Sequence, residues 1–350
     1  MGCIIYDLPL SMKNPIGIKD IAEMLGISVS TVSRAFRDTH DVNPATRQRV
    51  LSLAKELNFK PNKNASALAS GSTRNIGIVI PFITNYYFSM VISGIQEEAY
   101  EQDYNIILYV TNDSMAREKS LLENLSTSNL DGLLISISSD SSSNEHFDKL
   151  MARGLPIVFF DRVPNDIEAS KVVQDDFEGA FRATEFLIER GATRIAHIAG
   201  PKDLKFTQLR LSGYMEALTQ YKIAIDQSLI VHSGFSQVQG SEDTAKLLAL
   251  PQRPDAIFAA NDRKAVGAIL SIKEHGLQVG RDIGVIGFTN DPIATVVEPT
   301  LTTMEEPAFE IGKRACALLI RHIKNKNFEI QDLVVPSRLI IRNSVAHKRV

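Results

Sequence analysis

The sequence predicts two kinds of structure in one chain: a small all-α headpiece with a helix-turn-helix, then a larger α/β core of two lobes on doubly wound parallel sheets. Two short amphipathic helices separated by a Gly-Ile-Ser break occupy residues 17–34. From residue 75, apolar strand candidates alternate with amphipathic helices, as in parallel sheets covered on both faces. The 350 residues leave enough chain after the headpiece for two such lobes rather than one.

The first two helices have the features of a DNA-reading unit. Ile21 and Leu25 share one face of the first helix, and Gly26 can end it in a left-handed conformation. Ser28 can cap the second helix, which buries Val32 and exposes a short, hydroxylated and basic face. Such a face fits the major groove, where hydroxyls and Arg reach phosphates and base edges. The residues expected to contact DNA there are Val29, Ser30, Thr31, Ser33 and Arg34.

A third helix completes the headpiece and a short one follows it. Asn43 is the expected cap and Pro44 the first residue of the third helix. Its apolar stripe consists of Val50, Leu53, Ala54 and Leu57. Residues 60–71 suggest a further helix that is too short to be stable alone.

Charge and composition set the broad class. Residues 1–75 contain ten Lys and Arg against six Asp and Glu, and the remainder contains 28 against 35. A basic head on an acidic body is expected when only the head meets phosphate. No run of 18 apolar residues and no secretory signal are present, and two cysteines fit a reducing compartment, so we expect a cytoplasmic protein with no membrane contact.

The core begins at residue 75 with eight apolar strand candidates. They are Ile76–Ile80, Ile106–Val110, Gly132–Ile135, Pro156–Phe160, Ile195–Ala199, Leu229–Val231, Ala256–Ala260 and Ile283–Gly287. The polar segment Ser138–Ser143 is expected to be a solvated connection.

Several motifs in order carry a family resemblance. In the headpiece and hinge they are Ile18–Ala22, Val29–Arg34, Thr46–Val50 and Pro61–Gly71. In the core they are Asn85–Phe88, Phe160–Arg162, Gly200-Pro201, Arg210–Tyr214, Phe258–Asp262 and Gly287–Asn290. With these motifs the chain resembles the lactose-repressor (LacI/GalR-type) family of bacterial transcription regulators over nearly its whole length.

The resemblance implies a domain organisation. The core should be similar to periplasmic sugar-binding proteins, with ligand between two lobes at the carboxyl ends of the strands. The lobes should be joined by three crossings, near Arg162, Asn290 and Asn325. The expected segments are an N-terminal extension (1–14) with no assigned function, the headpiece (15–60), a hinge helix and linker (61–74), the core (75–343) and a tail (344–350). Within the core, lobe one should span about 75–162 and 291–324, and lobe two about 163–290 and 325–343.

A sugar-like effector agrees with the residue chemistry. Polar side chains that follow strands or start helices offer hydrogen bonds to hydroxyls, and two phenylalanines could cover the apolar face of a ring. These residues are Asn85, Asp161, Arg210 and Asn261, with Phe88 and Phe235. Each Asn or Asp could equally be only a helix cap.

Two departures from the family pattern bear on the effector. Thr289 stands where members commonly have an Asp that grips the ligand, and it can hydrogen-bond but brings no charge. Leu204 and Phe206 occupy a loop that carries polar purine-contacting residues in some members, which favours a sugar or sugar phosphate over a purine.

The resemblance also implies how DNA is bound. We expect a homodimer on a pseudo-palindromic operator, because a two-fold dimer doubles the base pairs read. Asn43 and the hinge residues Asn62, Ala65 and Leu68 should contact DNA. Residues 62–70 should be disordered in the free protein and helical on the operator, with Leu68 wedged into the minor groove.

Enzyme motifs are absent from the sequence. It contains no phosphate-binding loop, dinucleotide fingerprint, nucleophile elbow, zinc-protease motif or C-x-x-C, and its seven histidines show no metal-ligand spacing, so we expect no catalysis, cofactor or metal. Five carboxylates could in principle form a catalytic pair but are expected to be loop residues or caps: Asp113, Asp161, Asp175, Asp176 and Asp262.

The sequence thus predicts a DNA-binding transcriptional repressor that responds to a sugar or sugar phosphate. Three alternatives stay open: a sugar transport receptor, a sugar-processing enzyme fused to a DNA head, and a global regulator with a phosphoprotein corepressor. The missing export signal and the DNA head disfavour the first of these, and a turnover assay would test the second.

Overall fold

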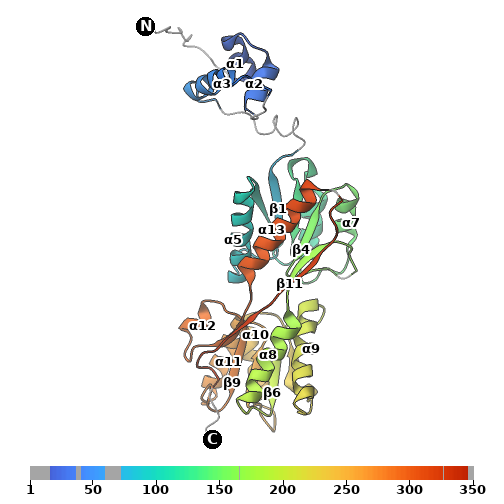
Figure 1. Ribbon diagram of the computed structural model, residues 1–350. Coiled ribbons are helices and arrows are strands. Elements are labelled where there is room, and N and C mark those ends of the chain that lie inside the picture. Colours follow the sequence, from blue (N-terminus) through green and yellow to red (C-terminus); the bar gives the residue numbers. More distant parts are fainter. Residues whose placement is uncertain (1–15, 37–40, 60–71, 165, 326, 346–350) are drawn as a thin grey trace. The chain divides into compact units, whose positions relative to one another are not determined.

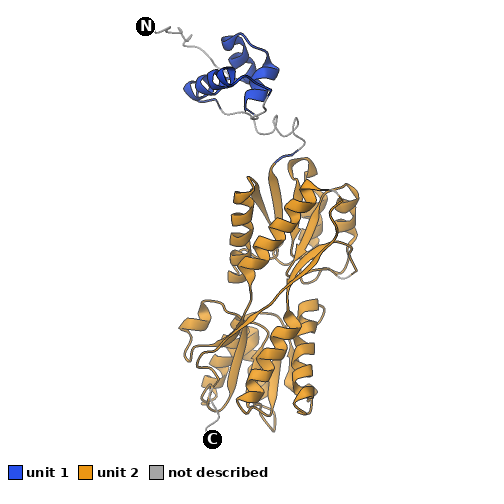
Figure 2. Ribbon diagram, in the orientation of Figure 1, with its two compact units in different colours: residues 1–73 blue, residues 74–350 orange. Residues whose placement is uncertain are grey.

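A computed structural model describes residues 16–36, 41–59, 72–164, 166–325 and 327–345. The chain divides into two compact units, residues 1–73 and 74–350 (Figure 2). The described residues of the first unit form three helices: α1 (Ile18–Leu25), α2 (Val29–Phe36) and α3 (Pro44–Glu56). They share one apolar core, which consists of Ile21, Ala22, Val32, Ala35, Val42, Val50 and Ala54.

The predicted signals at the helix ends of the headpiece are confirmed. Gly26 ends α1 with φ of 63°, in the left-handed region. The Ser28 hydroxyl accepts a hydrogen bond from the Thr31 amide at 3.1 Å, and the Asn43 side chain accepts one from the Ala45 amide at 2.9 Å. Each cap satisfies an amide that the first helical turn leaves without a partner.

The second unit contains two six-stranded sheets (Figure 1). The first has the order β11-β5-β4-β3-β1-β2 and the second β12-β10-β9-β8-β6-β7. Lobe one holds β1 (Asn75–Ile80), β2 (Asn105–Val110), β3 (Gly132–Ile135), β4 (Ile157–Phe160), β5 (Ser170–Gln174) and β11 (Asp332–Val335). Lobe two holds β6 (Ile195–Ala199), β7 (Ile230–His232), β8 (Ala256–Ala259), β9 (Gly284–Thr289), β10 (Thr302–Glu305) and β12 (Arg338–Ile340). All pairings are parallel except that of β10 with β12.

Helices cover both faces of each sheet, so each lobe has two apolar clusters. The helices of lobe one are α5 (Tyr86–Glu101), α6 (Met115–Glu123), α7 (Glu145–Ala152) and α13 (Ala308–Lys324), with the 3-10 turn η1 (Thr127–Asn129). Those of lobe two are α8 (Asp176–Glu189), α9 (Lys205–Gln220), α10 (Gln237–Leu248), α11 (Asp262–Glu274) and α12 (Ile293–Val296), with η2 (Gln227–Leu229). The strands alternate between the clusters: Ile78 and Leu134 face α5 and α13, while Val79 and Leu133 face the opposite side.

The expected lobe boundaries are wrong, because four strands were not predicted. β5 joins the first sheet and β10 the second, and β11 and β12 add a last strand to each. The chain therefore crosses between lobes after Gln174, Glu305 and Val335, rather than near Arg162, Asn290 and Asn325. The four strands have three to five residues with polar ends, so no apolar run marks them in the sequence.

Candidate effector cavity and DNA-reading helix

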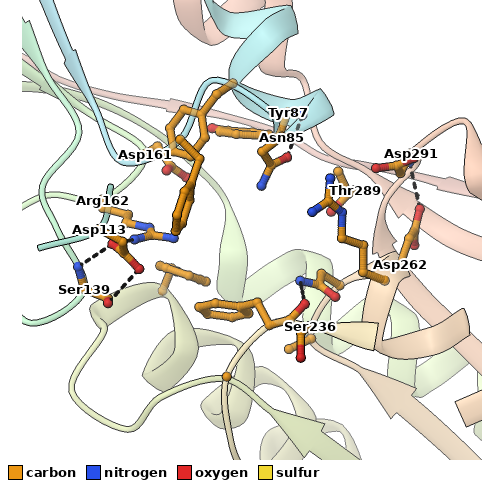
Figure 3. A pocket seen from close by; sticks show the side chains of 18 of the residues that line it. Asn85, Tyr87, Asp113, Ser139, Asp161, Arg162, Ser236, Asp262, Thr289 and Asp291 are labelled. Carbon is orange, nitrogen blue, oxygen red and sulfur yellow. Dashed lines mark hydrogen bonds and ion pairs between the residues drawn. The ribbon is translucent and has the colours of Figure 1, made fainter. Parts of the chain in front are cut away.

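A cavity of about 460 Å³ lies between the two lobes of the second unit. All seven residues proposed from the sequence as effector contacts line it: Asn85, Phe88, Asp161, Arg210, Phe235, Asn261 and Thr289. They come from both lobes, at strand ends and helix starts. Figure 3 shows Asp161 and Arg162 on one side of the cavity, facing Thr289 and Asp262 on the other. A ligand there would contact both lobes at once.

The two asparagines are helix caps as well as cavity residues. The Asn85 side chain accepts a hydrogen bond from the Tyr87 amide at 2.9 Å and starts α5. Asn261 starts α11 by accepting from the Lys264 amide at 2.8 Å, and its own amide donates to the Phe235 carbonyl oxygen at 3.1 Å. Both asparagines are therefore helix caps and also line the cavity.

Arg210 is buried and tied into the region where the chain crosses between lobes. Its Nε donates to Asp176 at 2.8 Å, and its Nη2 donates to Glu306 at 2.5 Å. Its Nη1 donates to the Ala260 carbonyl oxygen at 2.5 Å, and its guanidinium carbon lies 3.8 Å from the centre of the Phe288 ring. These contacts fix the guanidinium plane, so Arg210 is a structural centre of the site as well as a potential ligand donor.

Aromatic rings form one wall of the cavity. Phe206 and Phe235 are stacked with ring centres 5.6 Å apart and planes inclined by 21°. The Arg162 guanidinium carbon lies 5.9 Å from the centre of the Phe235 ring. Phe88 is only 2% exposed and belongs mainly to the core of lobe one, so its contribution to the cavity surface is small. Phe206 was not predicted as a cavity residue.

A second group of cavity residues that was not predicted from the sequence lies on the wall of lobe one. Asp113 accepts hydrogen bonds from the Arg162 guanidinium at 2.6 Å and from the Ser139 amide and hydroxyl at 2.8 Å each. All three residues line the cavity. Their pairing joins positions far apart in the sequence, which no local pattern reveals. The segment Ser138–Ser143 is also not simply solvated, since Ser138 is buried and hydrogen-bonded to Thr111 and Glu118.

Carboxylates with raised pKa values surround the cavity. Burial raises the pKa of Asp161 to about 7, against the opposing charge of Arg162. Burial likewise raises the pKa of Asp176 to about 6, although Arg210 opposes it, and that of Asp262 to about 7. Of the five carboxylates expected in loops or caps, Asp175 caps α8 by accepting from the Glu178 amide at 3.0 Å. Of the other four, Asp113, Asp161 and Asp262 line this cavity, and Asp176 lines a second cavity that shares Asp161 with it. The expectation that these four lie in solvated loops or caps is therefore corrected.

Three residues around the cavity adopt backbone conformations that side chains rarely favour. Asp161 and Asn290 have φ of 58° and 59°, and Thr289 has φ of 132°. Thr is β-branched, so positive φ is unusual for it and costs on the order of 1–3 kcal/mol. Such strain gathers at ligand sites, where the surrounding structure holds it.

In the headpiece, α2 presents the predicted face. Val29, Ser30 and Arg34 are exposed, Thr31 and Ser33 are half-buried, and Val32 is fully buried. The hydroxyls of Ser30 and Thr31 lie 2.7 and 2.8 Å from that of Ser28 and form a polar cluster at the start of the helix. Asn43 is exposed at the start of α3. The hinge residues Asn62, Ala65 and Leu68 lie outside the described residues.

The described residues contain neither a candidate membrane span nor a candidate metal cluster. None of their helices is both long and apolar enough for a membrane span. No group of three or more His, Cys, Asp or Glu among them could hold a metal ion.

Comparisons with known proteins match both units. Residues 17–62 match the model of bacterial regulatory proteins of the lacI family, and residues 184–345 match the periplasmic binding protein-like domain. The chain is 32% identical to the HTH-type transcriptional repressor PurR of Vibrio atlanticus over 330 residues, which cover 94% of this chain and 98% of that protein. The PurR of Aliivibrio fischeri (strain ATCC 700601 / ES114) is 32% identical over 335 residues, covering 95% and 98%.

Solved structures agree. The lac repressor dimer bound to operator and the anti-inducer ONPF is similar with a TM-score of 0.84 at 25% identity, covering 95% of this chain and 100% of that one. A transcriptional regulator CelR–cellobiose complex is similar with a TM-score of 0.73 at 28% identity, covering 94% and 99%. The headpiece, the two-lobed core and the identity along nearly the whole length lead to one conclusion: the chain belongs to the lacI family of bacterial regulatory proteins.

Proposed function

We propose that this protein is a homodimeric transcriptional repressor whose affinity for a pseudo-palindromic operator is controlled by a sugar-like molecule bound in the cavity between the lobes. The observation that carries the proposal is the mixed origin of the cavity lining. Asn85 and Asp161 belong to lobe one, and Arg210, Asn261 and Thr289 belong to lobe two. A ligand that contacts both sides favours one arrangement of the lobes, and this difference in affinity is what couples ligand to operator binding.

The chemistry of the wall supports a ring with hydroxyls. Carboxylate, amide and hydroxyl groups surround the cavity, and the stacked Phe206 and Phe235 offer an apolar surface. Leu204 at the start of α9 is 5% exposed and does not line the cavity, and Phe206 in the first turn of α9 lines it without a polar group, so the side chains there offer a purine little hydrogen bonding. A flat purine could still stack on the two phenylalanines, so purine bases belong in the test.

Calorimetry of the purified protein against monosaccharides, disaccharides, sugar phosphates and purine bases tests the effector class. We expect a sugar to bind, and Thr289→Val to weaken its binding about 2–10-fold through the loss of one hydrogen bond. Arg210→Ala should abolish the response, although it also removes the cation that pairs with Asp176 and Glu306. Thr219→Val, on an exposed part of α9, is the control. Binding of purine bases alone would overturn the sugar proposal.

The DNA side is tested with operator fragments. Arg34→Ala should cost about 1–3 kcal/mol of operator binding if the guanidinium pairs with a guanine, with no change in sugar affinity. Sedimentation at micromolar concentration should show a dimer. A monomer that binds its operator with full specificity would contradict the proposed assembly.

A further inference from the structure

Lys264 on α11 is fully buried, directly behind the segment that carries the aromatic wall of the cavity. Its ammonium donates hydrogen bonds to the Ser233 hydroxyl at 2.6 Å and to the Gly234 carbonyl oxygen at 3.1 Å. Asp243 of α10, at 2.9 Å, and the Ala199 carbonyl oxygen at the end of β6, at 2.8 Å, also lie within hydrogen-bond distance, so its three N–H groups are shared among four acceptors. One ammonium thus ties a helix, a strand end and the segment 233–236 together.

The Lys264–Asp243 pair is buried in the core of lobe two, where an ion pair costs more desolvation free energy than apolar side chains. Both side chains are at most 1% exposed, and burial lowers the pKa of Lys264 while Asp243 opposes that shift. Two buried charges lose their hydration, and an apolar pair of similar volume is often no less stable. Helices α10 and α11 come close enough for the pair because Gly240 lies against the Lys264 backbone, where a Cβ would collide. The pair is therefore better explained by the geometry that it imposes than by stability.

That geometry concerns Phe235. Gly234, Phe235 and Ser236 line the cavity, whereas Lys264 does not. Lys264 holds the segment at residues 233 and 234, and Ser236 holds it at the other end by capping α10. Between these anchors the Phe235 ring lies against the backbone of Gly200 and stacks on Phe206.

We infer that Lys264, with Asp243, is a positioning residue for effector selectivity: it holds Phe235 where its ring can cover the apolar face of a cyclic ligand. Only the part of this inference that concerns ligand selectivity rests on the proposed function. The positioning of the segment itself can be measured without any ligand.

The first experiment is hydrogen exchange, followed by mass spectrometry, on the full-length protein without ligand. The double variant Lys264→Met with Asp243→Ala removes both charges together. We expect amides of the segment 233–236 to exchange at least tenfold faster than in the wild type, with the sheet strands unchanged. Ser344→Ala is the control, because Ser344 is buried in the same lobe but bonds Val285 and Thr302 instead. Equal protection of the segment in the double variant and the wild type would overturn the inference.

If the double variant does not fold, Ser233→Ala gives the same test from the other side. It removes the hydroxyl that accepts from Lys264 and donates to Asp243 at 2.5 Å, and it leaves the direct Lys264–Asp243 contact in place. Faster exchange confined to residues 233–236 supports the clamp, and unchanged exchange contradicts it.

The second experiment measures selectivity by calorimetry with glucose, cellobiose and the open-chain polyol sorbitol. We expect the double variant to lose at least tenfold in affinity for whichever ring sugar binds, and less than threefold for sorbitol. Equal losses for ring and open-chain ligands would overturn the selectivity role. If the wild type binds none of these three and none of the other sugars and sugar phosphates tested by calorimetry, the proposed sugar effector fails, while the exchange result still decides whether Lys264 positions the segment.

Discussion

The two lobes share a strand order but hold their cavity segments by different chemistry. In lobe one the charged anchors are two carboxylates, Glu118 buried and Asp113 half-buried, whereas in lobe two a buried ammonium acts together with the buried Asp243 carboxylate. Glu118 and Asp113 hold the segment Ser138–Ser143, whereas Lys264 holds residues 233–236.

The difference follows from what each segment presents to the core. The segment of lobe one turns donors inward: the Ser138 amide donates to Glu118 at 2.7 Å and the Ser141 hydroxyl at 3.0 Å. His146 lies 3.0 Å from the same carboxylate. The segment of lobe two turns the Ser233 hydroxyl and the Gly234 carbonyl oxygen inward, and these accept from Lys264. Because buried polar groups must be paired, the orientation of the backbone decides the sign of the charge that holds it.

The largest loss of stability is expected when the Lys264 charge is removed and Asp243 stays in place. Lys264→Met leaves Asp243 buried without its main partner, and we expect a loss of about 3–5 kcal/mol in the free energy of unfolding. Urea denaturation followed by circular dichroism measures it. Adding Asp243→Ala should recover most of the loss, since it removes the stranded charge. Equal stability of the single and double variants would mean that the charges are independent.

Removing the charge of Glu118 in lobe one should cost less stability than removing the Lys264 ammonium in lobe two. Glu118→Gln keeps the shape of the side chain but replaces one acceptor oxygen with a donor facing Ser138, Ser141 or His146. We expect a loss of about 1–3 kcal/mol, the cost of one unsatisfied buried group. Glu123→Gln, on the exposed end of the same helix, is the control and should change stability by less than about 0.5 kcal/mol. A loss as large as that of Lys264→Met would remove the distinction between the lobes.

The third effect depends on pH and concerns Asp161, whose pKa of about 7 exceeds its ordinary value of 3.8. Between these values the folded protein binds more protons than the unfolded chain, so the contribution of Asp161 to stability falls as pH rises. The Asp161→Asn variant cannot ionise at this position. Relative to the wild type, its free energy of unfolding should therefore rise by about 2 kcal/mol between pH 4 and 8. This is half of the value from about 1.4 kcal/mol per pKa unit, because the side chain is partly exposed. Urea denaturation across this pH range measures the trend, with Asp148→Asn, at an exposed position of α7, as the control variant.

The sequence could predict whatever depends on local pattern. Gly26, Ser28 and Asn43 act as helix signals because their effects reach only three or four residues. Strands in the centre of each sheet are buried on both faces and appear as apolar runs, whereas β5, β10, β11 and β12 have three to five residues and each contains at least one polar residue. The positions of the lobe crossings depended on those four strands, so that part of the prediction failed.

The same limit applies to the cavity. Residues that directly follow a strand, such as Asp161 and Asn261, could be placed at the site from position alone. The partners of Arg210 could not, because Asp176 and Glu306 lie 34 and 96 residues away along the chain. Lys264 showed no sign of its role, since a lysine near a helix start is ordinarily exposed.

The strand order has a consequence for biosynthesis. The last strand of lobe one, β11, ends at Val335, and that of lobe two, β12, ends at Ile340. Neither sheet can be finished before these strands have been synthesised, whereas helices α1 to α3 of the headpiece are complete by Glu56. During translation the headpiece can therefore fold long before the two lobes, whose last strands end within a few residues of each other.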